Sequence, residues 1–315
     1  MIKAEKHIIS FSTRVHALGN SLRRDWLLYA MLVLPLAYYI IFKYVPMYGI
    51  TIAFRDYNIF AGVGASKWVG LKYFDTVFGQ KEFYHVVRNT LLLNMLDLIL
   101  GFPAPIILAI ILSELPFERF RKISQTILYL PYFISWVVIA TIALQLFSPE
   151  TGMVNVFLKR IGLTPIPFLS SNSHWVATYV GIGIWQGTGW GSIIYMAAIS
   201  GISPELYEAA MVDGAGRIRR IIHITIPGIG QTIVMMLILR MGGLVSISFE
   251  KPFLLGNSIV SEVSGVISTY VYHIGLESSN FSNATTVGLM QSVIGMAMIL
   301  LSNAIANKVS DSGIF

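Results

Sequence analysis

The sequence predicts an all-α membrane protein with about six transmembrane helices. Of its 315 residues, 55% are hydrophobic and only 12% are charged, and the mean hydropathy is +0.69. Soluble domains carry about twice that charged fraction. The apolar residues also form runs of about twenty, which as helices cross a hydrocarbon core about 30 Å thick. Run length and charge density together exclude a soluble helical bundle.

Six apolar windows are the predicted spans. The first is too long for a signal-peptide core and lacks a small-residue cleavage site, so we expect it to be retained. The windows are residues 26–46, 90–112, 126–147, 176–199, 230–249 and 285–305. They divide the chain into a segment at 1–25, a first span with a long extracytoplasmic loop at 26–89, a five-span core at 90–305 and a tail at 306–315.

The distribution of basic residues indicates how these spans are oriented. An even number of spans places both termini on one side of the membrane, together with the loops 113–125 and 200–229. That side holds 12 of the 22 Lys and Arg residues, whereas the three loops of the other side, which are longer in total, hold eight. Because short loops rich in Lys and Arg are retained in the cytoplasm, we predict that both termini are cytoplasmic.

The long loop after the first span, residues 47–89, is large enough to fold back on the protein. Residues 48–60 alternate in part between apolar and polar, residues 61–66 are glycine-rich, and residues 67–78 have an amphipathic pattern. This order predicts a short extended piece followed by an interfacial helix. The loop is then either a lid over the outer mouth or an inert surface.

Several classes of chemistry are excluded by what the sequence lacks. Without cysteine it has no disulfide, thiol nucleophile or cysteine-type metal site. The six histidines are scattered without HExxH or similar spacing, so we predict no metal site and no catalytic residue. No GxxxxGK(S/T) loop is present, so we expect no cofactor on this chain, no enzymatic activity of its own, and ATP bound by a partner. The net charge of +6 reflects basic cytoplasmic loops rather than a nucleic-acid partner.

The cytoplasmic segment 203–227 is a basic, glycine-hinged hairpin between two spans. The Ser-Pro pair at 203–204 is typical of a helix start. We expect that helix to end at Asp213–Gly214, where glycine tolerates the left-handed conformation that reverses the chain. A second helix is expected to begin at Ala215 and to end at the Thr-Ile-Pro before the fifth span. The hairpin is either a docking site for another protein or a solvated surface element.

This hairpin resembles the EAA loop of binding-protein-dependent ABC importer permeases. The matching residues are Glu208, Ala209, Ala210, Asp213, Gly214, Ala215, Ile224 and Pro227. Ile221 stands where that family usually has Phe, and Gln231 stands where a further Pro is common. The resemblance implies that the loop is a coupling helix seated in a cleft of an ATPase subunit. The matching residues from Glu208 to Ala215, with Arg217 beside them, would form that contact.

Further segments resemble the carbohydrate branch of these permeases, which takes up polysaccharides and complex oligosaccharides and is related to maltose-importer membrane subunits. The segments are FKYVPMYGITIAFRDYN (42–58), WVGLKYF (68–74), GFPAPIILAIILSEL (101–115), LPYFISWVV (130–138), GWGSIIYMAAISGI (189–202) and VISTYVYHIGL (266–276). The resemblance implies a type I ABC importer permease (MetI-like) fold in a bacterial inner membrane. It implies an ATP-driven importer of oligosaccharides or polysaccharide fragments.

The same resemblance implies the partners of the chain. They are a second, homologous but different permease subunit, two ATPase subunits that use ATP and Mg, and an extracytoplasmic solute-binding protein that delivers the sugar. ATP binding would close the ATPases, move both coupling loops and turn the pore from inward- to outward-facing. The alternatives are an importer for a non-sugar solute such as an amino acid or ion, a stand-alone secondary carrier, and a non-transporting scaffold.

Two charged residues, Asp97 and Arg240, lie within the predicted second and fifth spans. A charge near mid-bilayer costs about 2.5–3.5 kcal/mol on insertion scales, so each is expected to face protein or water. Their depths differ by only several Å at about 1.5 Å of rise per residue, a gap that an arginine side chain can cross. We hypothesise that they pair or line a common wet cavity. The alternative is two unrelated structural hydrogen-bonding groups.

Aromatic rings and amides within the spans are the candidates for sugar contact, because pyranose rings stack on aromatics and amides bind hydroxyls. Gln186 and Trp190 are four residues apart and share a helix face. The candidates are Asn94, Tyr132, Trp136, Gln145, Trp185, Gln186 and Trp190. In the alternative interpretation these aromatics are packing residues, because Gly183, Gly187 and Gly191 have the GxxxG spacing of close helix contacts.

Overall fold

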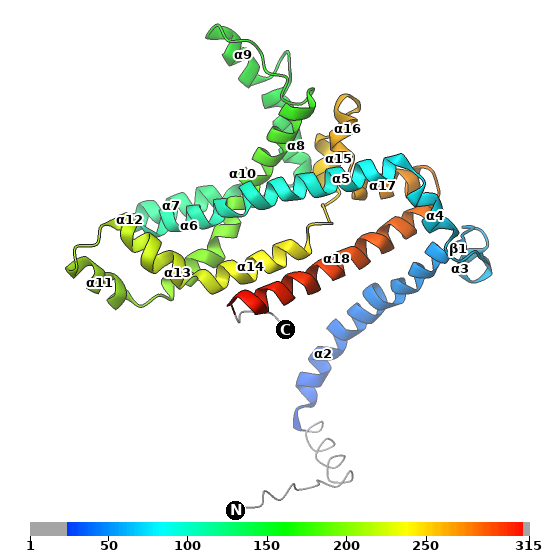
Figure 1. Ribbon diagram of the computed structural model, residues 1–315, viewed down its shortest axis with the longest axis horizontal. Coiled ribbons are helices and arrows are strands. Elements are labelled where there is room, and N and C mark those ends of the chain that lie inside the picture. Colours follow the sequence, from blue (N-terminus) through cyan, green and yellow to red (C-terminus); the bar gives the residue numbers. More distant parts are fainter. Residues whose placement is uncertain (1–23, 311–315) are drawn as a thin grey trace, which may run out of the picture.

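Helices form almost all of the regular structure in the computed structural model, which describes residues 24–310 (Figure 1). The predicted cytoplasmic segment 1–25 lies outside the described residues except for its last two positions, and so does the tail beyond Ser310. Between these limits the chain forms only one two-stranded ribbon. The helical class predicted from the apolar windows is therefore confirmed.

The first helical stretch runs beyond the predicted span 26–46. Its parts are α2 (Trp26–Tyr39), the π-helical η1 (Ile40–Tyr44) and the 3-10 helix η2 (Val45–Phe54). The expectation of an extended piece from residue 48 is wrong, because the chain stays helical to Phe54. Here η2 packs along α18 (Phe281–Ser310), and the Thr286 hydroxyl donates a 3.3 Å hydrogen bond to the carbonyl of the fully buried Ala53. Packing against a neighbouring helix thus overrides the alternating pattern.

The rest of the long loop forms a small cap that is tied to α18. Its elements are β1 (Arg55–Asp56), α3 (Gly62–Ala65), β2 (Lys67–Trp68) and α4 (Lys72–Phe78), with the two strands antiparallel. The Ser282 hydroxyl donates to the Arg55 carbonyl at 2.7 Å and accepts from the Tyr57 N–H at 3.1 Å. The Tyr73 hydroxyl donates to Asp56 at 2.6 Å, and partial burial followed by this hydrogen bond raises the pKa of Tyr73. The predicted helix after the glycine-rich segment is confirmed as α4.

The second predicted span lies within a helical stretch of 33 residues, Lys81–Ser113. Its parts are α5 (Lys81–Leu96), the π-helical η3 (Asp97–Gly101) and α6 (Pro103–Ser113). Pro103 lies in the first turn of α6. It has no N–H to donate, so it interrupts the ladder of backbone hydrogen bonds between α5 and α6. A π-helical turn directly before it absorbs this irregularity, so the helix continues.

The third predicted span, 126–147, is broken rather than continuous. Its parts are α7 (Glu118–Tyr129), the 3-10 helix η4 (Leu130–Phe133) and α8 (Trp136–Phe147). The first two meet α8 at an angle of 100°. Ile134 and Ser135 at the break are extended, with ψ angles of 131° and 150°. The Ser135 hydroxyl accepts a 3.5 Å hydrogen bond from the Val138 N–H and thereby caps the start of α8.

The fourth predicted span is the middle part of the 29-residue α10 (Asn172–Ser200), which follows the short α9 (Met153–Arg160). α10 packs along α6 and lies at the centre of the core. The backbones of α10 and α7 approach so closely at Gly189 that a side chain there would overlap the Leu128 carbonyl. The fully buried Trp175 donates its indole N–H to the Leu255 carbonyl at 2.8 Å. α10 thus contacts its neighbours closely both near its start and in its middle.

The hairpin before the fifth predicted span has the expected hinge, and its second arm is displaced along the chain by one or two residues at each end. Its elements are α11 (Pro204–Val212), α12 (Arg217–Arg220), η5 (Ile221–Thr225) and α13 (Ile226–Gly228), followed by α14 (Gly230–Gly242). The second helix begins at Arg217 rather than Ala215, and it ends at Gly228, one residue after Pro227. Proline is tolerated there because it occupies the first turn of α13, after a π-helical turn. α14 then leaves at a bend of 60° and ends at Gly242, seven residues before the end of the predicted window.

Short helices connect α14 to the last long helix. They are α15 (Glu250–Leu255), η6 (Ser258–Val260), α16 (Ser261–Ser264), α17 (Ile267–Tyr272) and η7 (His273–Glu277). Asn89 on α5 holds this region, since its amide donates to the carbonyls of Glu262 at 2.7 Å and Gly265 at 3.0 Å. The sixth predicted span, 285–305, lies inside α18.

Between residues 24 and 310, three helices are long and apolar enough to cross a membrane, and the two bent pairs bring the number to five if each is one span. α10 has sufficient length, but its composition does not place it in that group. Figure 1 shows α11 and α12 at one end of the helix bundle, whereas β1, α3 and α4 lie at the opposite end. The hairpin and the long loop therefore lie at opposite ends of the protein.

Candidate functional site

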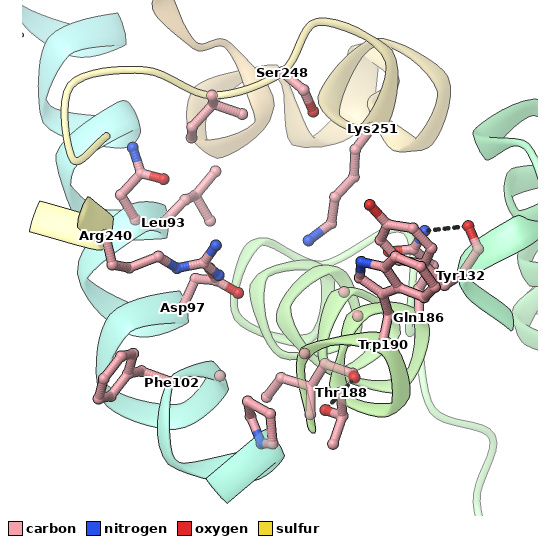
Figure 2. A pocket seen from close by; sticks show the side chains of 18 of the residues that line it. Leu93, Asp97, Phe102, Tyr132, Gln186, Thr188, Trp190, Arg240, Ser248 and Lys251 are labelled. Atoms are coloured by element: carbon pink, nitrogen blue, oxygen red, sulfur yellow. Dashed lines mark hydrogen bonds and ion pairs between the residues drawn. The ribbon is translucent and has the colours of Figure 1, made fainter. Parts of the chain in front are cut away.

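A cavity of about 450 Å³ lies within the helix bundle, with α10 along one side (Figure 2). Five of the seven predicted sugar-contact residues line it: Asn94, Tyr132, Trp136, Gln186 and Trp190. Both predicted intramembrane charges line it as well. The helical spacing of Gln186 and Trp190 correctly placed them on one face of α10, which is the face turned to this cavity.

Two of the predicted residues lie elsewhere. Trp185 lines a separate apolar cavity of about 450 Å³ between α8 and α10, and its side chain is half exposed. Gln145 lies on α8 and is not among the residues that line the central cavity. Trp185 is adjacent to Gln186 in sequence, but neighbours in a helix point in directions about 100° apart. The sequence alone could not show which of the two directions faces the cavity.

Asp97 and Arg240 form an ion pair across the cavity wall, as hypothesised from their depths. The guanidinium Nη2 of Arg240 on α14 donates to Oδ2 of Asp97 on η3. Gly101 makes room for the carboxylate, because a side-chain carbon there would lie 2.8 Å from Asp97 Oδ1. The Asp97 side chain is 28% exposed and the Arg240 side chain 52%, so the pair is solvated from the cavity. The pair therefore joins two spans without being sealed in the protein interior.

The Tyr132 and Trp190 rings form a stacked pair on the cavity wall. Their centroids are 4.9 Å apart and their planes differ by 6°, and Phe133 packs edge-on against Trp190 at 5.5 Å. The Gln186 amide donates to the Tyr132 carbonyl at 3.4 Å. Asn94 is also tied to backbone, since its amide donates to the Leu244 carbonyl at 2.6 Å. Both amides are thus engaged by backbone carbonyls, whereas Tyr132 and Trp190 remain 42% and 44% exposed.

Lys251 also lines the cavity, although it was not among the predicted site residues. It lies on α15, and only 8% of the residue is exposed. Its Nζ is 3.7 Å from the ring centre of Tyr179 and 5.5 Å from that of Trp136. A lysine next to Glu250, two residues beyond the end of the predicted span 230–249, was the only signal in the sequence. Its position in the cavity depends on the path of residues 243–249, which hydropathy does not predict.

The hairpin α11–α12 presents most of its surface to solvent. Gly214 has a φ of +76°, as expected for the reversal, and the Ala215 N–H donates to the Ala210 carbonyl at 2.8 Å. Leu206, Met211, Val212 and Ile218 are exposed by 54%, 52%, 89% and 72%. The predicted contact residues share this hairpin: Glu208, Ala209, Ala210, Asp213, Gly214, Ala215 and Arg217. Exposed large apolar side chains of this kind typically mark a protein-binding surface.

The described residues contain no group of three or more His, Asp or Glu side chains placed to hold a metal ion. The charged side chains that line the central cavity are Asp97, Arg240 and Lys251. Geometry of this type suits binding of a polar solute between charges and aromatic faces.

Comparison with known proteins agrees with this description. Residues 101–311 match the family described as "Binding-protein-dependent transport system inner membrane component". The chain is 41% identical over 295 residues to Protein LplB of Bacillus subtilis, covering 94% of this chain and 93% of that protein. It is also 41% identical over 288 residues to the polygalacturonan/rhamnogalacturonan transport system permease protein YteP of Bacillus subtilis, covering 91% and 90%.

A solved structure is similar over nearly the whole chain. It is the crystal structure of a bacterial ABC transporter involved in the import of the acidic polysaccharide alginate. One chain of it matches with a TM-score of 0.86 and 38% sequence identity, covering 93% of this chain and 99% of that chain. A second structure of a bacterial alginate ABC transporter, in complex with an alginate pentasaccharide-bound periplasmic protein, matches with the same TM-score.

Proposed function

The chain belongs to the binding-protein-dependent transport system inner membrane component family, and we propose that it is one permease subunit of an ATP-driven ABC importer for oligosaccharides or polysaccharide fragments. The observation that carries this proposal is the likeness, over nearly the full chain, to the permease of an alginate importer. The central cavity supports it, since stacked aromatic faces next to charged groups suit a sugar chain.

We assign the proposed partners to the two ends of the protein. An extracytoplasmic solute-binding protein delivers the sugar at the end formed by β1, α3 and α4, and two ATPase subunits act from the opposite end. The exposed apolar side chains of α11–α12 form the contact with one ATPase. A second, homologous permease completes the pore as a heterodimer. This chain itself hydrolyses no ATP and binds no cofactor.

The proposed topology has six spans in a bacterial inner membrane, with both termini cytoplasmic. They are α2 with η1 and η2, α5 with α6, α7 with α8, α10, α12 to α14, and α18. The bent pairs count as single spans, and α10 counts because its polar residues face the central cavity rather than lipid. Cysteine scanning with a membrane-impermeant thiol reagent tests this arrangement in a chain that has no native cysteine.

Reconstitution of the complete complex in proteoliposomes tests the function. We expect uptake of an oligosaccharide only with the binding protein outside and ATP inside, and no uptake when the ATPase subunits are omitted. Uptake without ATPase subunits would instead identify a secondary carrier. Identification of the ligand that copurifies with the binding protein separates a sugar importer from an importer of amino acids or ions.

A further inference from the structure

Lys251 places a positive charge in the central cavity without an anion of its own. Among residues 24–310 its ammonium donates no hydrogen bond and forms no ion pair, although the residue is only 8% exposed. The neighbouring carboxylate, Asp97, is bound to Arg240 instead. The cavity lining therefore has one negative and two positive side chains, which leaves one uncompensated positive charge.

The ammonium is held at a defined position by aromatic rings and by a missing side chain. The Tyr179 ring lies under it at 3.7 Å and the Trp136 ring beside it at 5.5 Å. On α10, Gly183 leaves the space that the ammonium occupies, because a side-chain carbon there would overlap Nζ. Figure 2 shows the ammonium directed into the space between the Asp97–Arg240 pair and the Tyr132–Trp190 pair. It is thus both fixed and directed into the cavity.

We propose that Lys251 binds the carboxylate of an acidic sugar unit in the cavity, and that it makes this permease selective for oligosaccharides that contain uronic acids. The inference rests on the proposed function and deepens it. A buried charge is costly unless it is paired, so an anionic ligand gains more from this site than a neutral one. The stacked Tyr132–Trp190 pair lies on the side of the cavity opposite the Asp97–Arg240 pair, where it can contact the face of a sugar ring.

A purely structural role for Lys251 predicts something different. In that case the side chain only fastens α15 to α10 through Tyr179, and its removal lowers the import of every substrate alike. The two roles are separated by comparing an acidic probe with its neutral counterpart. A pentagalacturonate and its fully methyl-esterified form have the same length and differ in charge.

The experiment measures import of both probes by the complete complex in proteoliposomes with ATP and binding protein. Lys251→Met is expected to reduce import of pentagalacturonate about tenfold or more, the effect of losing one charge-assisted hydrogen bond, and import of the ester by less than about twofold. Lys251→Arg keeps the charge and is expected to keep the preference for the acid. Lys122→Met on α7, a lysine exposed by 69%, is the matched control and leaves the acid-to-ester ratio unchanged.

Three results would overturn the inference. Lys251→Met could lower the import of both probes equally, or it could lower the import of neither. The third such result is a wild-type complex that imports the ester but not the acid. If Lys251→Met does not assemble, Gly183→Ala serves instead, because it displaces the ammonium and keeps the charge. We expect it to lower the acid-to-ester ratio, and an unchanged ratio contradicts the inference. Failure of the proposed function is distinct, since the wild-type complex would then import neither probe in an ATP-dependent manner.

Discussion

Asn155 and Ile166 exchange two hydrogen bonds of 2.9 Å each. The Asn155 amide donates to the Ile166 carbonyl, and its own carbonyl oxygen accepts from the Ile166 N–H. The same amide donates to the carbonyls of Ser148 at 3.2 Å and Pro149 at 3.3 Å. Asn155 is fully buried on α9, and its side chain holds together the two ends of the segment that connects α8 to α10.

Asn155→Leu is therefore expected to open the segment 148–166. The change keeps the branched shape of the side chain but leaves buried backbone groups without partners, which costs about 1–3 kcal/mol for each group. Limited proteolysis should cut the variant faster within this segment, and import driven by the binding protein should fall. Asn172→Leu is the control, because Asn172 forms only a surface hydrogen bond with Glu262. Equal protease resistance of wild type and Asn155→Leu would contradict the prediction.

Gly189→Ala is expected to destabilise the contact between α10 and α7. Its new methyl group meets the Leu128 carbonyl, which is backbone and cannot rotate away. Overpacking of this kind costs about 1–3 kcal/mol. Thermal unfolding of the purified complex measures the effect. Gly181→Ala, on the same helix with open space around it, should unfold at the wild-type temperature, and a similar shift in both variants would show that the close approach is not responsible.

Changes at the hinge of the coupling hairpin are expected to separate ATP hydrolysis from uptake. Gly214 has a φ of +76° and donates its N–H to the Met211 carbonyl at 3.1 Å, so proline can satisfy neither requirement. Gly214→Pro should abolish ATP-driven uptake, and Gly214→Ala should reduce it, because a left-handed alanine costs about 1–2 kcal/mol. Uptake and ATP hydrolysis are measured together.

Gly216→Ala is the matched control for the hinge. Gly216 has an ordinary φ of −69° and no neighbour within 4 Å of a new side-chain carbon. We expect wild-type uptake from this variant. If Gly214→Pro also imports at the wild-type rate, the hairpin does not transmit the action of the ATPase.

Neutralising one member of the Asp97–Arg240 pair is expected to be worse than neutralising both. Asp97→Asn leaves an arginine, and Arg240→Gln leaves an aspartate, without a partner inside the membrane, at about 2.5–3.5 kcal/mol on insertion scales. Each single variant should lower the yield of assembled complex, and the double variant should recover part of it. Glu118→Gln, in an exposed ion pair with Lys122, should leave the yield unchanged. A double variant no better than either single one would show that pairing is not what matters.

Much of this architecture could be predicted from the sequence, because it depends on local patterns. Apolar runs predicted where the long helices lie, and Ser-Pro and Asp-Gly predicted both ends of α11. The Asp97–Arg240 pair could be predicted because an isolated charge in hydrocarbon needs a partner and each span offered only one candidate.

Other features depend on packing, which a hydropathy window averages away. The 100° break before α8 rests on two extended residues, Ile134 and Ser135, within an otherwise apolar run. The place of Lys251 in the cavity depends on how residues 243–249 turn back after α14. Trp185 faces away from the cavity for a similar reason, since only the neighbours of α10 decide which of its faces is inside.

The separation of Asp97 and Arg240 along the chain has a consequence for how the protein is made. They are 143 residues apart, so at about 5–20 residues per second the ribosome adds the arginine roughly 7–30 s after the aspartate. During that interval the aspartate lacks the arginine that binds it in the folded protein. We therefore expect the early helices to remain near the protein-conducting channel until the fifth emerges, so that release into lipid is late and collective.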